Sequence, residues 1–145
     1  MIVTDSYYPP NAFRICADKI AEDVEGRVIS PLCKEDIMFL GMGELLVKMD
    51  ELFDSVGYPQ AYQDKRSFDR DKGRVNAYRG IPQGMRKPKE IIGQAGDGIT
   101  LDVVVASRKN ASWQGEIYNV EGRFLGGFSG EIELLESIIK AANIN

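Results

Sequence analysis

The strongest constraint on the fold is a pattern of three strand-like runs followed by an amphipathic helix, which the sequence contains twice. Residues 43–57 and 129–145 carry apolar side chains at helical spacing, so each segment predicts a helix with one buried stripe. The runs before each helix are short, rich in β-branched or aromatic residues and bounded by turn residues, as strands are. They are AFRICADKI, EGRVIS and DIMFLG before the first helix, and ITLDVVVAS, WQGEIYN and RFLGGFS before the second.

The two occurrences of this pattern align without a gap when the chain is shifted by 89 residues against itself. Gly26 then falls on Gly115 and Phe39 on Phe128, and the Glu-Leu-Leu in one helix stripe falls on the same tripeptide in the other. The identities are few, but they preserve the spacing of a mid-strand glycine, an aromatic residue and a helix start. We therefore predict an α+β fold in which tandem βββα repeats form an antiparallel sheet with two helices packed on it.

The length of the chain suits a single domain, 1–145, because neither half buries its sheet face alone. The predicted internal repeats are 12–56 and 101–143, and a linker, 57–98, joins them. Apart from one helical turn at PKEIIGQ, the linker is predicted to be a loop rich in glycine and proline. A connection of this length without regular structure is uncommon in a compact domain and often carries function.

The linker is also basic. Residues 64–90 contain nine Lys or Arg and four Asp or Glu, a net charge of +5, whereas the whole chain carries −4. Three interpretations are open: the segment folds over the acidic surface of its own body, it is a solvated loop, or it contacts phosphate or nucleic acid, with aromatic residues available for stacking. The candidate binding residues of the linker are Arg66, Arg70, Tyr78 and Arg79.

The only tryptophan, Trp113, lies in the second strand of the second repeat. Strand alternation places it on the same face as Gly115 and Ile117, and the glycine leaves room for a large ring to lie against the sheet. We therefore expect a core or rim residue, with the Arg, Lys and Asn at 108–110 forming a solvated hairpin tip. The candidate binding residues of this hairpin are Arg108, Asn110, Trp113 and Gln114.

The strand that begins the second repeat is apolar on both faces. Leu101, Val103 and Val105 alternate with Val104 and Ala106, so both faces of the strand need a cover. Three sources are open: the other repeat, the linker or a second subunit. The third alternative makes the protein a homodimer.

The absence of histidine limits the chemistry of this chain. Ser-His-Asp and Cys-His catalysis and histidine-dependent zinc sites are excluded. The segment DRDKG lacks the further ligands of a calcium loop, and neither glycine-rich phosphate-binding motif is present. We therefore predict no catalytic residue, no metal site and no cofactor, and we expect Cys16 and Cys33 to be free thiols.

Composition indicates a globular protein, with 43% hydrophobic and 28% charged residues, which is enough apolar material for a core. No apolar run approaches the ~18 residues that a membrane span requires. The first residues lack the basic and apolar regions of a signal peptide. The predicted location is therefore the cytoplasm, without membrane contact.

Three segments resemble a family of small, functionally unassigned bacterial proteins. They are GYPQAYQDKRSF (57–68), NASWQG (110–115) and FSGEIELL (128–135), in the middle and C-terminal parts of the chain. In that family Arg-Ser follows the phenylalanine of the last segment, so this chain departs from the pattern where the helix begins. The resemblance implies a bacterial, cytosolic protein. It implies no activity, so no catalytic residue follows from it.

These observations lead to three hypotheses of function. The leading one is a non-enzymatic binding or regulatory module with an unknown protein partner, acting through the linker and the hairpin 108–114. The alternative is nucleic-acid or nucleotide binding through the basic linker, 64–90. An enzyme comes third, because the chain lacks histidine and any recognisable arrangement of nucleophile and carboxylates.

Overall fold

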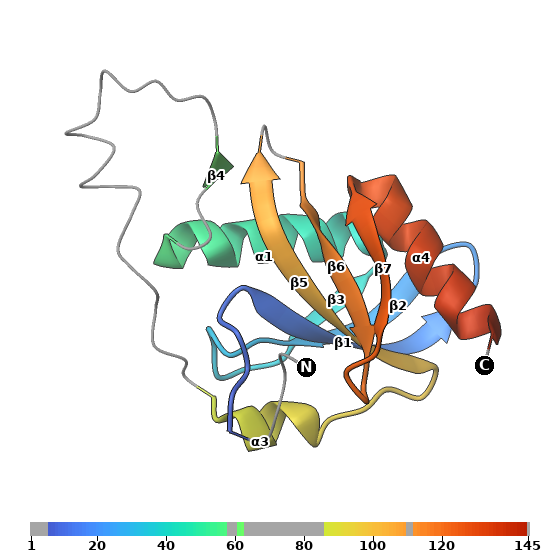
Figure 1. Ribbon diagram of the computed structural model, residues 1–145, viewed down its shortest axis with the longest axis horizontal. Helices are drawn as coiled ribbons and strands as arrows, with labels where there is room; N and C mark the ends of the chain where they lie inside the picture. The colour runs from blue at the N-terminus through green and yellow to red at the C-terminus, as the bar shows by residue number, and fades with distance from the viewer. Residues whose placement is uncertain (1–5, 58–60, 63–85, 110–111, 145) are drawn as a thin grey trace.

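The protein is built on one sheet, in which six strands pair antiparallel in the order β3-β2-β1-β5-β6-β7 (Figure 1). The computed structural model describes residues 6–57, 61–62, 86–109 and 112–144. The strands are β1 (Ala12–Ile20), β2 (Val24–Ile29), β3 (Ile37–Leu40), β4 (Ala61–Tyr62), β5 (Ile99–Lys109), β6 (Gln114–Asn119) and β7 (Phe124–Ser129). The helices are α1 (Met42–Val56), α3 (Pro88–Ile92) and α4 (Glu131–Ile144).

The predicted α+β class with an antiparallel sheet and two packed helices is confirmed. The expected helical turn in the linker is confirmed as α3. The short strand β4 was not expected, and it adds a parallel pair to the end of β5. Among the described residues, none of the helices combines the length and the apolar character that crossing a membrane requires.

The main core lies between the sheet and the two long helices. Strand alternation turns Phe13 and Ile15 of β1 toward the same cluster as the buried stripes of α1 and α4. Trp113 belongs to this core, with only 3% of its surface exposed, and its ring centroid lies 5.8 Å from those of both Phe13 and Phe53. The expectation of a core or rim position for Trp113 is therefore confirmed.

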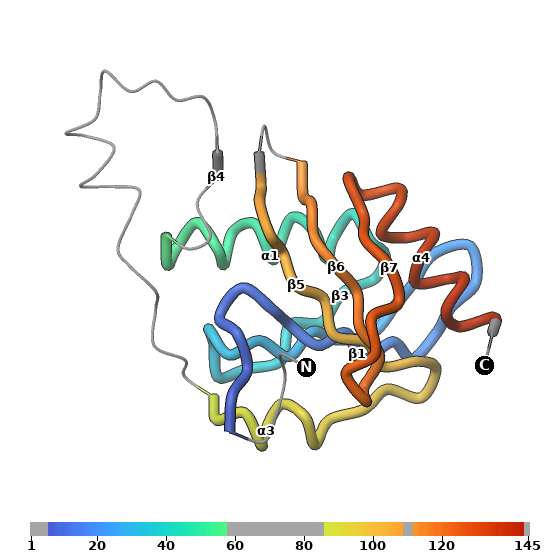
Figure 2. Tube along the Cα trace, viewed as in Figure 1, coloured from blue at the N-terminus to red at the C-terminus, as the bar shows by residue number. Residues whose placement is uncertain are grey.

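A second, smaller core covers the opposite face of the central strands. Cys16 of β1 and Ile29 of β2 form a cluster with Tyr8 and with Ile91 of α3. Figure 2 shows α3 on the other side of β1 from α1. Val104 of β5 packs against this cluster, so the linker supplies part of the cover that the sequence required.

The expectation that the whole second face of β5 is covered is wrong at Ala106, which is exposed. The pairing between β1 and β5 ends at Ala12 and Val104, so Ala106 lies beyond the part of β5 that β1 flanks. Ala106 is exposed because the residues that cover this face of the sheet lie over the central strands.

Both long helices follow a strand through a glycine with positive φ, Gly41 at 115° and Gly130 at 101°. Only glycine adopts this conformation without strain. The Glu44 carboxylate then accepts a hydrogen bond from the backbone N–H of Leu40, the last residue of β3, at 2.9 Å. Glu133 of α4 accepts a hydrogen bond from the backbone N–H of Ser129 in β7 at 2.7 Å in the same way, so each strand is joined directly to the first turn of its helix.

Two strand glycines are required by close approach of the backbone. A methyl group added at Gly26 would overlap the carbonyl oxygen of Cys16, and one added at Gly115 would overlap that of Val104. These contacts lie inside the sheet, where the backbone has little room to move.

We predict that Gly115→Ala lowers the free energy of unfolding by about 2–3 kcal/mol, because overpacking forces the neighbouring strand to shift. Gly43→Ala in α1 is the matched control, since its added methyl group meets no atom within 4 Å. That control should stabilise the protein by up to about 1 kcal/mol, as alanine favours helix. Urea denaturation measures both. Equal stability of the two variants would contradict the prediction.

Candidate functional site

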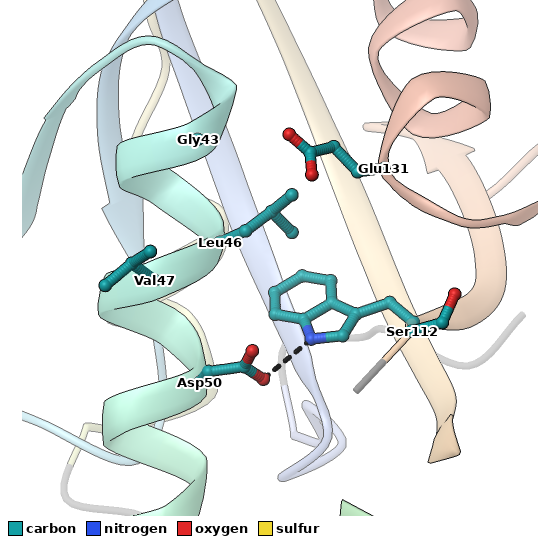
Figure 3. A pocket seen from close by; sticks show the side chains of 7 residues that line it. Gly43, Leu46, Val47, Asp50, Ser112 and Glu131 are labelled. Atoms are coloured by element: carbon teal, nitrogen blue, oxygen red, sulfur yellow. Dashed lines mark hydrogen bonds between the residues drawn. The ribbon is translucent and has the colours of Figure 1, made fainter. Parts of the chain in front are cut away.

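The candidate site lies where the β5–β6 hairpin meets α1. The Asp50 carboxylate of α1 accepts a hydrogen bond from the indole N–H of Trp113 at 2.8 Å (Figure 3). The same carboxylate accepts a second hydrogen bond from the guanidinium of Arg108 at 3.1 Å. Arg108 also donates to the Asp54 carboxylate at 3.0 Å. One turn of helix separates the two aspartates, so both carboxylates face the same strand end. We call Asp50, Asp54, Arg108 and Trp113 the hairpin cluster.

Arg108 is buried, with 2% of its surface exposed, and its guanidinium lies 5.3 Å from the centroid of the Phe53 ring. The expectation of a solvated hairpin tip is therefore wrong at this residue. The physical reason is that two carboxylates and an aromatic face on α1 stabilise the buried cation.

A pocket of ≈ 350 Å³ opens beside the hairpin cluster. Only the Oδ1 atom of Asp50 accepts the bonds from Arg108 and Trp113, and no described residue donates to its Oδ2 atom. Glu131, at the start of α4, is exposed and forms no hydrogen bond with a described residue. The lining residues are Gly43, Leu46, Val47, Asp50, Ser112, Trp113 and Glu131 (Figure 3).

The predicted hairpin residues have different environments. Trp113 contributes to both the core and the pocket wall. Arg108 does not line the pocket but donates a hydrogen bond to Asp50, which does. The side-chain oxygen of Gln114 accepts a hydrogen bond from Ser107 at 2.8 Å, which bridges the two strands of the hairpin. Asn110 lies outside the described residues, and so do the linker candidates Arg66, Arg70, Tyr78 and Arg79.

Sequence reasoning missed the acidic side of this site. Asp50 and Glu131 lie in helices that the pattern predicted, but helical periodicity alone does not say which polar side chains meet a strand. The spacing of Asp50 and Asp54 around Phe53 was the available signal, because it places two carboxylates and an aromatic ring on adjoining parts of α1.

The linker begins beside the hairpin cluster. Ala61 of β4 pairs in parallel with Arg108, and Tyr62 pairs with Lys109. These backbone contacts hold the start of the linker at the end of β5. The backbone of 61–62 therefore lies next to the candidate site.

The end of the linker is held on the opposite face of the sheet by Arg14. This buried guanidinium donates to both carboxylate oxygens of Asp102, at 3.0 and 2.8 Å, and to the carbonyl oxygen of Ile92 in α3 at 2.9 Å. Arg14 and Asp102 face each other across the β1–β5 pair. A paired, fully hydrogen-bonded charge is the form in which an arginine tolerates burial.

Two further arginines join the end of the linker to the body. Arg27 donates to the carbonyl oxygen of Ala95 at 3.1 Å, and Arg86 forms an ion pair with Asp36 at 2.7 Å. Arg86 also donates to the carbonyl oxygen of Lys34. Arg86 thus lies against the acidic surface of its own body, and residues 64–85 of the basic segment lie outside the described residues.

The pKa values of Tyr8, Cys16 and Cys33 are raised from their ordinary values. Burial, followed by the charge and hydrogen bond of Asp102 at 2.6 Å, raises the pKa of Tyr8 well above its ordinary value. Cys16 and Cys33 are free thiols, as expected. Burial also raises the pKa of both thiols, so they are mainly protonated. Among the described residues, no group of three or more acidic, cysteine or histidine side chains could hold a metal ion.

Comparison with known protein families, with curated proteins and with solved structures gave no match.

We predict that Asp50→Asn lowers the free energy of unfolding by about 1–2 kcal/mol, because the buried Arg108 guanidinium loses its less exposed partner. Asp54→Asn is the control. The Asp54 side chain is 64% exposed against 38% for Asp50. The control should change stability by less than about 0.5 kcal/mol. Chemical denaturation followed by Trp113 fluorescence measures both, and an equal or reversed order of effects would contradict the assignment.

Tyr8 should make the protein less stable at high pH. Above about pH 10 the unfolded chain loses the phenol proton while the folded chain keeps it, so stability falls as pH rises. Tyr8→Phe should flatten this fall between about pH 9 and pH 11. Tyr7→Phe, at an exposed neighbour, should leave it unchanged. Denaturation midpoints across this range test the prediction, and identical slopes in Tyr8→Phe and the wild type would refute it.

Proposed function

We propose that the protein is a non-enzymatic binding module that recognises a basic side chain of a protein partner in the pocket beside the hairpin cluster. The observation that carries this proposal is that carboxylate oxygens without a hydrogen bond from a described residue lie in the same pocket as apolar side chains. Asp50 keeps its Oδ2 atom and Glu131 keeps its whole carboxylate without a bond from a described residue. Leu46 lies between the two carboxylates, and Val47 also lines the pocket (Figure 3).

The chemistry of the lining favours a ligand that is both cationic and aliphatic. A lysine or arginine side chain places a hydrocarbon stem on apolar surface and its charged end on carboxylates. Asp50 is already oriented by Arg108 and Trp113, so binding requires little ordering of this acceptor. The same carboxylates disfavour phosphate, because like charges repel.

The alternative function is nucleic-acid binding through the basic linker. Its support is the net charge of +5 over 64–90, together with the attachment of the linker to the body at both ends. A cationic segment of this kind binds phosphates with an affinity that falls steeply with salt. Arg86 already pairs with Asp36, which reduces the charge available for such contacts.

We also propose that the fold arose by tandem duplication of a βββα unit, 12–56 and 101–143. Support comes from strand register, because the Gly26–Phe39 pair and the Gly115–Phe128 pair hold corresponding places in the β2–β3 and β6–β7 hairpins. The helix starts agree too. Gly41 donates to the carbonyl oxygen of Val24 at 2.9 Å and Gly130 to that of Trp113 at 2.7 Å.

The proposed duplication bears on function because the two units differ at one cap. In the first unit the Asp23 carboxylate accepts a hydrogen bond from the N–H of Met42 at 2.9 Å and so caps α1. The corresponding residue of the second unit is Ser112, which lines the pocket. The Ser112 side chain is shorter than that of Asp23 and lines the pocket, which supports the proposal that the second unit is adapted to binding. A bacterial, cytoplasmic setting stays a prediction from the family resemblance.

We predict that a lysine-rich peptide shifts the NMR signals of the Trp113 indole N–H and the Ser112 amide, whereas an oligothymidylate of similar length does not. Glu131→Gln should weaken peptide binding about fivefold, in line with roughly 1 kcal/mol for an exposed charged contact. Glu136→Gln is the control on the same helix, as Glu136 is exposed and does not line the pocket.

The same titrations separate the two functions. Oligothymidylate binding that weakens steeply with salt and is lost in Arg66→Ala, Arg70→Ala, Arg79→Ala favours the nucleic-acid alternative. Peptide binding that is unaffected by Glu131→Gln would reject the pocket as the site of recognition.

A further inference from the structure

The six antiparallel strands end in β3 on one side and in β7 on the other, and these two edge strands differ in how their outward backbone groups are satisfied. In an antiparallel edge strand, alternate residues turn both their N–H and their C=O away from the sheet. Such groups pair readily with another strand unless the protein covers them.

The edge formed by β3 is covered by two side chains of α1. Glu44 accepts a hydrogen bond from the N–H of Leu40 at 2.9 Å, and Lys48 donates to the carbonyl oxygen of Met38 at 2.8 Å. Glu44 and Lys48 also form an ion pair at 3.5 Å. A charged pair therefore lies along the outward groups of β3, which is a common way to block strand addition.

Among the residues that the structure describes, the edge formed by β7 has half of this cover. Glu133 of α4 accepts a hydrogen bond from the N–H of Ser129 at 2.7 Å, as Glu44 does on the other edge. Four residues further along α4 lies Ser137, where α1 has Lys48. The outward groups of Gly127, two residues before Ser129, consequently form no hydrogen bond with a described residue.

The residues of β7 leave room for a strand of another chain to pair with this edge. A methyl group added at Gly126 would meet no atom within 4 Å, and at Gly127 it would make only ordinary contact, so packing inside this chain requires neither glycine. Neither glycine has a positive φ. Interior strand glycines often mark a close approach by another backbone. The neighbouring Phe124 and Leu125 are 55% and 43% exposed.

We propose that β7 pairs antiparallel with β7 of a second copy of this chain, across a twofold axis near Gly127. The residues Phe124–Ser129 include no charge, so a contact that places the same residues against each other brings no like charges together. The Glu44–Lys48 pair on β3 prevents β7 from pairing with β3 of another copy. The association therefore closes as a dimer and does not extend into a filament.

Analytical ultracentrifugation over a concentration series tests this dimer. The wild type should change from one chain to two as concentration rises. Ser137→Lys should restore the missing cover of β7 and shift the dissociation constant upward by at least tenfold. Ser55→Lys, which adds the same charge at an exposed position of α1, should leave the dimer unchanged.

Gly127→Pro is an independent test, because proline removes the outward N–H without removing a bond to β6. It should also abolish the dimer. Circular dichroism checks that each variant is folded, and if Gly127→Pro is not, Ser137→Lys decides. A wild type that stays a single chain at all concentrations overturns the proposal, and so does a dimer that withstands Ser137→Lys.

Discussion

The pairing of β1 with β5 is the contact on which the rest of the structure depends. It joins the N-terminal and C-terminal halves of the sheet, and it places Arg14 opposite Asp102 at the centre of the molecule. On one face of this pair lies the main core with α1 and α4, and on the other lie α3 and Tyr8. Because the Arg14 guanidinium bonds to Asp102 and to α3 together, the charge that joins the strands also holds the end of the linker.

Buried charge has a second role at the hairpin cluster. Arg108 was expected in solvent as a contact for a partner, yet it lies behind Asp50 and fixes the direction of that carboxylate. The groups open to a ligand are then acidic, whereas the linker that begins alongside is basic. The opposite signs of these two surfaces explain why the proposed recognition of a basic side chain and the alternative of nucleic-acid binding involve different parts of one region.

Much of the architecture was predictable because local periodicity reports burial. The helix stripes, the core position of Trp113 and the α+β class all follow from which apolar residues share a face. The site was less predictable. Asp50 and Arg108 are far apart in the chain, and nothing in the spacing of either residue indicates that they form an ion pair. The linker, which contributes Ile91 to the cluster beside Val104, was likewise one of three alternatives, since an apolar surface does not specify what covers it.

By itself, the sequence determined where the main strands and helices form and which faces they bury. It also excluded histidine-dependent catalysis, because the chain has no histidine. These properties depend on residue type and short-range spacing. Only the tertiary structure decided that Arg108 is buried, that the pocket is acidic and that Lys48 covers one sheet edge while Ser137 leaves the other open. These features arise where distant segments meet, and the energy of a charge or a backbone group there depends on the partners that folding brings to it.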